Sequence, residues 1–165
     1  MNPNLAKYVL RNPIHFLAFG FGAGLSPVAP GTMGTIVGIP VYLLLVQFSQ
    51  HVYITVVFLF AVLGVWLCHT SAKALNVPDH PGIVWDEITG FLITMFLLPV
   101  GWKEILAGFL LFRLFDIWKP FPIRWLDRQI KGGLGIMLDD IVAGLFAFFI
   151  LQAMMKLWGS VLPGF

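Results

Sequence analysis

Charged side chains are scarce in this sequence of 165 residues, where Asp, Glu, Lys and Arg together make up 11%. None of these four residue types occurs between Arg11 and Lys73, a stretch of 61 residues. Soluble domains contain about 25% charged and about 45–50% apolar residues, whereas hydrophobic residues here reach 59%. The composition therefore indicates a membrane protein, and the uncharged stretch is long enough to cross a bilayer twice.

Several other groups are missing. Cys68 is the only cysteine, which excludes a disulfide framework and a cysteine-rich metal cluster. The net charge of +2 is too small to indicate nucleic-acid binding. The sequence also lacks the Gly-x-Ser-x-Gly motif of serine hydrolases and the P-loop pattern of nucleotide-binding proteins. We therefore expect no nucleic-acid partner and no serine-hydrolase chemistry.

Apolar segments predict an all-α, polytopic membrane helix bundle with about five membrane-embedded helices, folded as one integral-membrane domain over residues 1–165. The expected helices cover residues 36–49, 53–68, 88–98, 105–117 and 141–158. The earlier run at 16–25 contains three glycines and is followed by Pro27, which favours a buried or re-entrant segment over a cleaved signal peptide. In the last helix, Gly144 is an expected point of close helix packing.

The basic residues set the expected orientation. If the N-terminus is cytoplasmic, eight Lys and Arg residues fall on the inner side and only Lys103 and Lys156 fall outside, in agreement with the positive-inside rule. Seven of the eight acidic residues fall on the same inner side, and Glu104 is the exception. We therefore expect a multi-pass protein whose polar loops cluster on the cytoplasmic side.

Carboxylates form three groups near the expected cytoplasmic helix ends. They are Asp86 with Glu87, Asp116, and Asp139 with Asp140. Charged groups at the membrane boundary need a partner or a cation. Oxygen ligands without histidine or cysteine clusters favour a hard cation, and Mg²⁺ is the best match because it binds few carboxylates together with water and phosphate. Salt bridges to Lys and Arg side chains are the alternative, and a solvated ion pair is the favoured interpretation for Asp127, which is adjacent to Arg128.

Basic and hydroxyl side chains near these acids are candidate contacts for a substrate phosphate, because guanidinium and ammonium groups bind phosphate oxygens well. Arg113 and Asp116 share a helical face at positions i and i+3, and Lys119 is expected partly round the same helix. Two glycine-rich segments, 29–35 and 131–135, precede expected helices and offer backbone N–H groups to an anion. The candidate substrate-binding residues are Thr32, His69, Lys73, Arg113, Lys119 and Arg124.

Four segments of the sequence resemble signature segments of the phosphatidylglycerophosphatase A family. They read SPVAPGTMG at 26–34, VWDEITG at 84–90, FRLFDIWKPFP at 112–122 and GGLGIMLDDIVAG at 132–144. Together they extend over nearly the whole chain, in order.

The resemblance implies a Mg²⁺-dependent integral membrane phosphatase of the bacterial inner membrane, with its active site facing the cytoplasm. Such an enzyme hydrolyses the terminal phosphomonoester of phosphatidylglycerophosphate to phosphatidylglycerol and phosphate in phospholipid biosynthesis. By motif position, the candidate catalytic carboxylates or metal ligands are Asp86, Glu87, Asp116, Asp139 and Asp140.

A small membrane cation transporter that uses the carboxylate cluster is the alternative function, because intramembrane carboxylates also line ion paths. The outer halves of the expected helices carry few polar groups, which favours the phosphatase. For a phosphatase, direct attack by water and an aspartyl-phosphate intermediate both stay open. The number of metal ions, the general acid and the oligomeric state are open as well.

Overall fold

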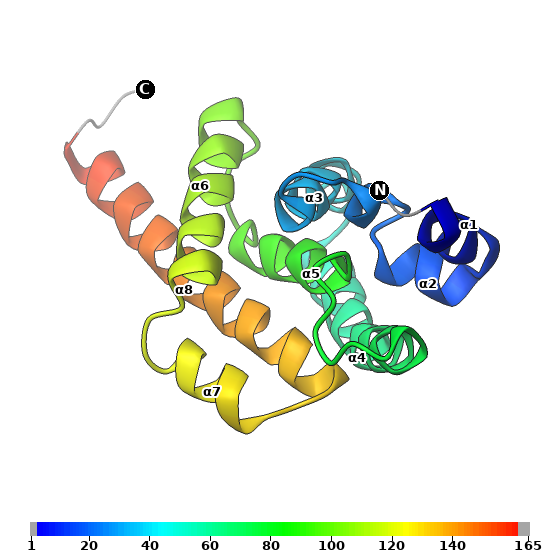
Figure 1. The fold of residues 1–165 in the computed structure, drawn as a ribbon. Coiled ribbons are helices and arrows are strands. Elements are labelled where there is room, and N and C mark those ends of the chain that lie inside the picture. The colour runs from blue at the N-terminus through cyan, green and yellow to red at the C-terminus, as the bar shows by residue number, and fades with distance from the viewer. Residues whose placement is uncertain (1–2, 162–165) are drawn as a thin grey trace.

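The computed structural model describes residues 3–161, and in that range the chain forms eight α-helices, one short 3-10 helix and no strand (Figure 1). The elements are α1 (Pro3–Arg11), α2 (Pro13–Ala18), η1 (Ala23–Leu25), α3 (Pro30–Leu45), α4 (Gln50–Leu75), α5 (Trp85–Thr94), α6 (Trp102–Trp118), α7 (Ile123–Gln129) and α8 (Gly133–Val161). The expected all-α fold is therefore confirmed for this range. The remaining terminal residues of the expected domain lie outside the described residues.

Two helices, α4 and α8, are long and apolar enough to cross a membrane. Helix α4 has 26 residues and measures about 39 Å at 1.5 Å per residue, more than a bilayer core of about 30 Å. Helix α3 is also apolar but has 16 residues. These helices support a membrane protein, and the expected number of crossings stays a prediction.

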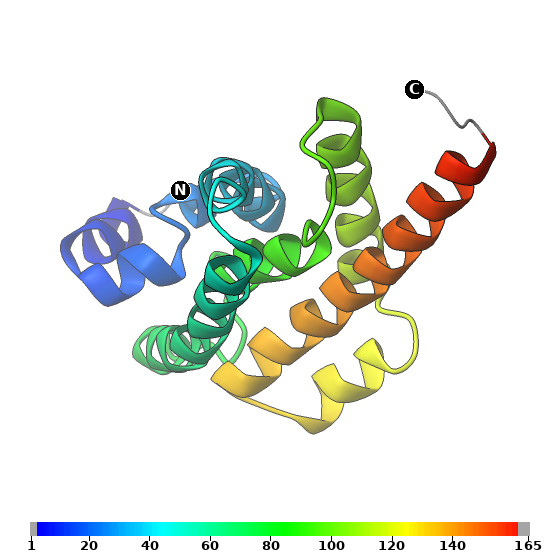
Figure 2. The ribbon, with the colours of Figure 1, turned by 180° about the vertical axis from the view of Figure 1, so that it is seen from behind.

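The short helix α5 lies at the centre of the bundle, with α3, α4, α6 and α8 around it (Figures 1 and 2). Most of its side chains are buried. Its ten residues measure about 15 Å, so it is too short to cross a bilayer by itself. Trp85 anchors its first turn to α4, because the indole Nε1 donates a hydrogen bond to the carbonyl of Phe60 at 3.0 Å and the two rings stack.

Glycines bring α5 and α8 into close contact. A Cβ at Gly90 would lie 2.7 Å from the backbone oxygen of Asp140, and a Cβ at Gly144 would collide with the backbone oxygen of Gly90. Thr94 joins the two helices by donating a hydrogen bond to the carbonyl of Gly144 at 3.3 Å. The close packing expected at Gly144 is therefore confirmed, and it holds Asp140 beside the first turns of α5.

The N-terminal helices α1 and α2 pack to one side of the bundle, where α2 contacts α4 (Figure 1). His15 and Ser71 link these elements through a buried hydrogen bond of 2.9 Å between Nδ1 and Oγ. The burial expected for the segment 16–25 is confirmed at Ala18 and Phe19, which are fully buried.

The helix boundaries differ from the expected ones where the site is built. Helix α3 begins at Pro30 and α8 at Gly133, so the glycine-rich segments supply the first turns of helices and not only the loops before them. Helix α6 ends at Trp118, and Lys119 is its C-cap in the left-handed region with φ of 47°. Lys119 is therefore not on the helical face predicted for it, because the chain turns away before that residue.

Candidate active site

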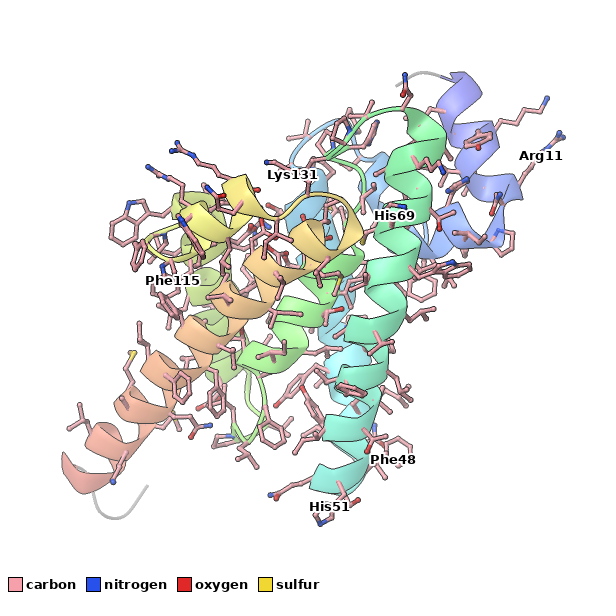
Figure 3. The ribbon with its side chains drawn as sticks, turned by 90° about the horizontal axis from the view of Figure 1, so that it is seen from below. Arg11, Phe48, His51, His69, Phe115 and Lys131 are labelled. Carbon is pink, nitrogen blue, oxygen red and sulfur yellow. The ribbon has the colours of Figure 1, made fainter. Side chains whose placement is uncertain are left out.

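The acidic residues gather at one end of the bundle, where α4 ends and α8 begins. Figure 3 shows His69 and Lys131 toward this end, and His51 with Phe48 at the opposite end. A cavity of about 280 Å³ opens here between α3, the loop before α5, α5, α6 and α8. Its charged lining residues are Asp79, Asp86, Glu87, Arg113, Asp116, Lys119, Asp139 and Asp140. The structure therefore brings all five predicted catalytic carboxylates into one cavity.

Three of these carboxylates form a compact cluster. Asp86 and Glu87 lie in the first turn of α5, and Asp140 lies about two turns into α8. Each offers one oxygen atom, and these three atoms lie within 4.8 Å of one another. Acidic side chains are favoured in the first turn of a helix by its dipole, and the glycine contact between α5 and α8 supplies the third. We call these residues the carboxylate triad.

The triad is buried and incompletely paired. Asp86 is 8% exposed and Asp140 is 2% exposed. Within the described part of the chain, Asp86 Oδ1, Glu87 Oε2 and Asp140 Oδ2 have no hydrogen-bond partner. Burial and the charge of Glu87 raise the pKa of Asp86 well above its usual range, and burial and the charge of Asp140 likewise raise the pKa of Glu87.

Unpaired buried carboxylates are costly unless a cation compensates them. A donor set made only of carboxylate oxygens matches a hard divalent cation such as Mg²⁺. The three orphaned oxygens therefore fit a metal site formed by the triad.

Arg113 lies next to the triad. Its Nη1 donates a hydrogen bond to Asp116 Oδ2 one turn along α6, and the same nitrogen lies 3.9 Å from Glu87 Oε1. Its buried Nε has no partner among the described residues. The shared helical face expected for Arg113 and Asp116 is therefore confirmed. The ion pair between them is the one that the salt-bridge alternative predicted, and the guanidinium retains a donor without a partner among the described residues.

Gly31 leaves the room for this arrangement. It lies in the first turn of α3, and a Cβ there would collide with Glu87 Oε1 and lie 3.0 Å from Arg113 Nη1. Any larger residue would displace one of these two groups. From the sequence, this glycine was expected only as part of a segment that offers backbone N–H groups to an anion.

Lys119 and Asp139 form a second ion pair in the cavity. Lys119 Nζ donates to Asp139 Oδ2 and lies 3.6 Å from Asp127 Oδ2 on α7. Burial lowers the pKa of Lys119, but the charge of Asp139 outweighs it and the net shift is upward. Lys119 is therefore a permanent cation at neutral pH. Asp127 is half-exposed and ion-paired, as expected, but its partner is Lys119 and not Arg128.

Four predicted substrate-binding residues do not line the cavity. His69 and Lys73 are exposed on α4 and line a different cavity together with Gly132. Arg124 is exposed on α7 and donates to the carbonyl of Trp118 at 3.0 Å. Thr32 follows Gly31 in α3 but is not among the lining residues. Helical spacing predicts which residues share a face, but not which neighbouring helix that face meets.

Asp79 lines the cavity, although it was not among the predicted site residues. It lies in the loop between α4 and α5, is exposed and lines the cavity mouth. The available signal was its membership in the acidic set on one side of the membrane. The loop conformation, which begins at Asn76 in the left-handed region with φ of 54°, returns the chain to the cavity.

The fold and the site together define a class, namely a helical protein with membrane-length helices and a buried cluster of carboxylates beside cationic side chains suited to phosphate. Comparison with known proteins narrows the class. The family model described as Phosphatidylglycerophosphatase A matches residues 16–155. This chain belongs to the phosphatidylglycerophosphatase A family and is a phosphatase. The resemblance noted in the sequence is therefore confirmed.

Individual relatives support the assignment. Phosphatidylglycerophosphatase A of Escherichia coli (strain K12) is 49% identical over 154 residues, which cover 93% of this chain and 90% of the relative. Phosphatidylglycerophosphatase A of Haemophilus influenzae is 44% identical over 92% of this chain and 94% of the relative. A "Putative phosphatidylinositol-3-phosphatase" of Bacteroides thetaiotaomicron is 36% identical over 80% of this chain and 87% of the relative. No solved structure matches this chain significantly.

Proposed function

We propose that this protein hydrolyses the terminal phosphomonoester of phosphatidylglycerophosphate to phosphatidylglycerol and phosphate in a bacterial inner membrane. The name shared by two relatives supports the substrate. The observation that carries the proposal is the carboxylate triad with three unpartnered oxygens beside the free guanidinium donor of Arg113. A conduction path would need polar groups along the helices, whereas seven of the eight acidic residues belong to or adjoin one cavity.

The triad would hold Mg²⁺ in this proposal. When bound, the ion neutralises phosphate charge and lowers the pKa of a coordinated water. Mg²⁺ usually keeps several waters and uses few protein ligands, which agrees with a site that opens into a cavity. Asp86, Glu87 and Asp140 are then the metal ligands.

Arg113 and Lys119 would hold the phosphoryl group. The unpartnered Nε of Arg113 is available to a non-bridging phosphate oxygen, and charge-assisted bonds of this kind are the stronger ones. Lys119 lies at the end of α6, and its ion pair with Asp139 keeps the ammonium group protonated by raising its pKa. Two cations at fixed positions stabilise the charge that spreads over the oxygens during transfer.

Asp116 and Asp139 are the predicted catalytic carboxylates outside the triad, and each is held by one cation. In direct hydrolysis, a water oxygen bonds to phosphorus and its proton passes to one of these carboxylates. The bond from phosphorus to the glycerol oxygen breaks, and the leaving oxygen takes up a proton to become the hydroxyl of phosphatidylglycerol. In the covalent alternative, a carboxylate oxygen bonds to phosphorus and displaces the glycerol oxygen, which takes up a proton, and water then hydrolyses the acyl phosphate to phosphate and the free carboxylate. Trapping the enzyme with labelled substrate distinguishes the two, because a hydroxylamine-sensitive phosphoprotein requires the covalent path.

The membrane placement is part of the proposal. We infer that α4 and α8 cross the bilayer and that the cavity end faces the cytoplasm, in keeping with the bias of basic residues. Single cysteines at the exposed positions Lys131 and Gln50 report the two ends, because Cys68 is buried and gives little background. An impermeant maleimide should label Lys131→Cys only from the cytoplasmic side and Gln50→Cys only from the periplasmic side. The reverse pattern would refute this orientation.

The activity is tested with purified protein in mixed micelles of phosphatidylglycerophosphate and detergent. Phosphate release should require Mg²⁺ and stop when the ion is chelated. Asp86→Asn should lower kcat by at least about 100-fold, since even residues that merely support metal ligands cost about 10–100-fold. Glu104→Gln is the matched control, because Glu104 is not a cavity residue. Unchanged turnover in Asp86→Asn would contradict the site assignment.

A further inference from the structure

The mouth of the acidic cavity has two chemically different sides. The loop before α5 contributes Asp79 and Pro81, which are exposed. On α6, the exposed lining residue is Ile117, whose side chain is 70% exposed. A cavity that holds charged groups inside is therefore bordered on the α6 side by an apolar side chain.

Ile117 continues an apolar stripe along α6. At about 100° per residue, Leu106, Leu110, Arg113 and Ile117 fall within about 60° of one another around the helix. Leu106 and Leu110 are 48% and 57% exposed. We call Leu106, Leu110 and Ile117 the α6 stripe. Its last residue lines the cavity that also contains the guanidinium of Arg113.

The α6 stripe is not a core surface. Helix α6 buries Gly108, Phe112 and Phe115 on its opposite face, where it packs against α5 and α8. From Leu106 to Ile117 the helix rises about 17 Å, close to one leaflet of a bilayer core about 30 Å thick. Exposed Trp118 lies just beyond the cavity end of the stripe, as is typical of aromatic residues at a membrane interface.

We propose that the α6 stripe binds the acyl chains of the phospholipid substrate, so that the lipid reaches the cavity sideways from the bilayer along α6. This inference rests on the proposed function. The occupant must join an apolar chain of leaflet length to a phosphate, because the stripe ends at Ile117, which lines the cavity that holds Arg113 and the carboxylate triad. A phospholipid whose headgroup ends in a phosphomonoester has this form.

Other exposed apolar residues lack this continuity. Leu59 on α4 is 56% exposed, almost the same as Leu110, but α4 contributes no residue to the lining of the cavity, whereas α6 does. Such positions contact bulk lipid without guiding a headgroup. Leu59 and Leu110 therefore form a matched pair of the same residue type and exposure.

The test compares two substrates of the full-length protein. One is phosphatidylglycerophosphate in mixed micelles, and the other is its deacylated, water-soluble headgroup. In Leu110→Asn, kcat/KM for the lipid should fall about tenfold relative to kcat/KM for the headgroup, which corresponds to about 1.4 kcal/mol. Leu106→Asn should act in the same direction, and the double variant should lose more. Leu59→Asn should leave both values unchanged.

Each other outcome is informative. Equal losses on both substrates in Leu110→Asn would show that the stripe acts through the shape of the cavity, and an unchanged lipid value would place the acyl chains elsewhere; either result overturns the inference. If the unaltered protein hydrolyses neither substrate, the proposed function fails first. If the unaltered protein cleaves both the lipid and the headgroup, but the variants show equal losses or no loss, the proposed function stands and the α6 path is refuted.

A binding measurement avoids dependence on turnover. Phosphatidylglycerophosphate with a photoreactive diazirine in one acyl chain is crosslinked to the inactive Asp86→Asn protein, with phosphatidylcholine bearing the same chain as reference lipid. Adducts found by mass spectrometry should be enriched on α6, relative to α4, for phosphatidylglycerophosphate only. The same distribution for both lipids would exclude a specific acyl-chain path.

Discussion

The two ends of the helix bundle hold their polar side chains in different ways. At the end away from the cavity, Tyr53 donates a hydrogen bond to the carbonyl of Leu92 at 2.7 Å, and Gln152 donates to the carbonyl of Phe96 at 3.1 Å. At the cavity end, the carboxylate triad has three orphaned oxygens within the described residues. Buried polar groups are almost always paired in folded proteins. At the far end the hydroxyl of Tyr42 is also buried without a partner among the described residues, but it is a neutral group. The cavity end, which buries three unpaired carboxylate oxygens, therefore carries the larger cost in stability.

The largest difference is expected from Asp140→Asn. This change removes one buried charge and one proposed metal ligand, so activity should fall at least about 100-fold. Stability in the absence of Mg²⁺ should not fall, because an unpaired buried carboxylate is itself destabilising. Thermal unfolding with and without Mg²⁺ checks both statements: the unaltered protein should gain Tm with the ion and the variant should not. A large loss of Tm in chelator would show that Asp140 is a structural group.

A smaller effect is expected from Gly31→Ala, where the new methyl group would displace Glu87 or Arg113. We expect kcat to fall about 10–100-fold, as for residues that orient metal ligands. Gly101→Ala is the control at the other end, since its methyl group would meet only the carboxylate of Glu104. Phosphate release should be slower in Gly31→Ala and unchanged in Gly101→Ala. Equal activity would mean that Glu87 and Arg113 need no fixed position.

Tyr53→Phe should show the opposite behaviour to the triad variants. It removes the hydroxyl bonded to the carbonyl of Leu92, and the loss should lower the free energy of unfolding by about 1 kcal/mol. Activity should stay within a factor of two, roughly, because the change is remote from the cavity. Denaturation in micelles and the phosphate assay give the two values. If Tyr53→Phe is stable but inactive, the two ends of the bundle do not differ in the way described.

The smallest effect concerns His15, a paired group on the cavity side of the molecule. Burial lowers the pKa of His15 below its usual 6.5, so the folded state disfavours its protonation while the unfolded state accepts it. This contribution to stability is complete above about pH 6.5 and declines as the pH falls toward the folded-state pKa. Tm measured between pH 8 and pH 5, roughly, should fall less in His15→Asn than in the unaltered protein. If the plots of Tm against pH for the two proteins are parallel, His15 is not the source of the pH dependence.

Much of the fold could be predicted from hydrophobic patterning, but the helix boundaries could not. The apolar segments correctly indicated α3, α4, α6 and α8, because helix-length apolar runs have few other structures available in a membrane. The short helices α1 and α7 were not expected, since each is stabilised by packing against neighbours. The early start of α8 was also missed, although it sets the depth of Asp139 and Asp140.

The candidate site shows the same division between residue types and neighbours. Charge scarcity made Asp86, Glu87, Asp116, Asp139 and Asp140 conspicuous, and all five line the cavity. Helical spacing also predicted the shared face of Arg113 and Asp116, on which the two side chains form an ion pair. It did not show that His69 and Lys73 face another cavity, because the orientation of α4 relative to α8 depends on contacts between residues far apart in the chain.

Composition and motifs alone were enough for the all-helical class, the family and the set of acidic residues, because a membrane protein tolerates charge only where it is used. The packing of the helices determines which of these acidic residues contact one another and which contact a basic residue. Asp140 joins Asp86 and Glu87, while its neighbour Asp139 turns to Lys119. Adjacent helical residues point about 100° apart, so the packing of α8 against α5 and α6 gives two identical side chains different contacts.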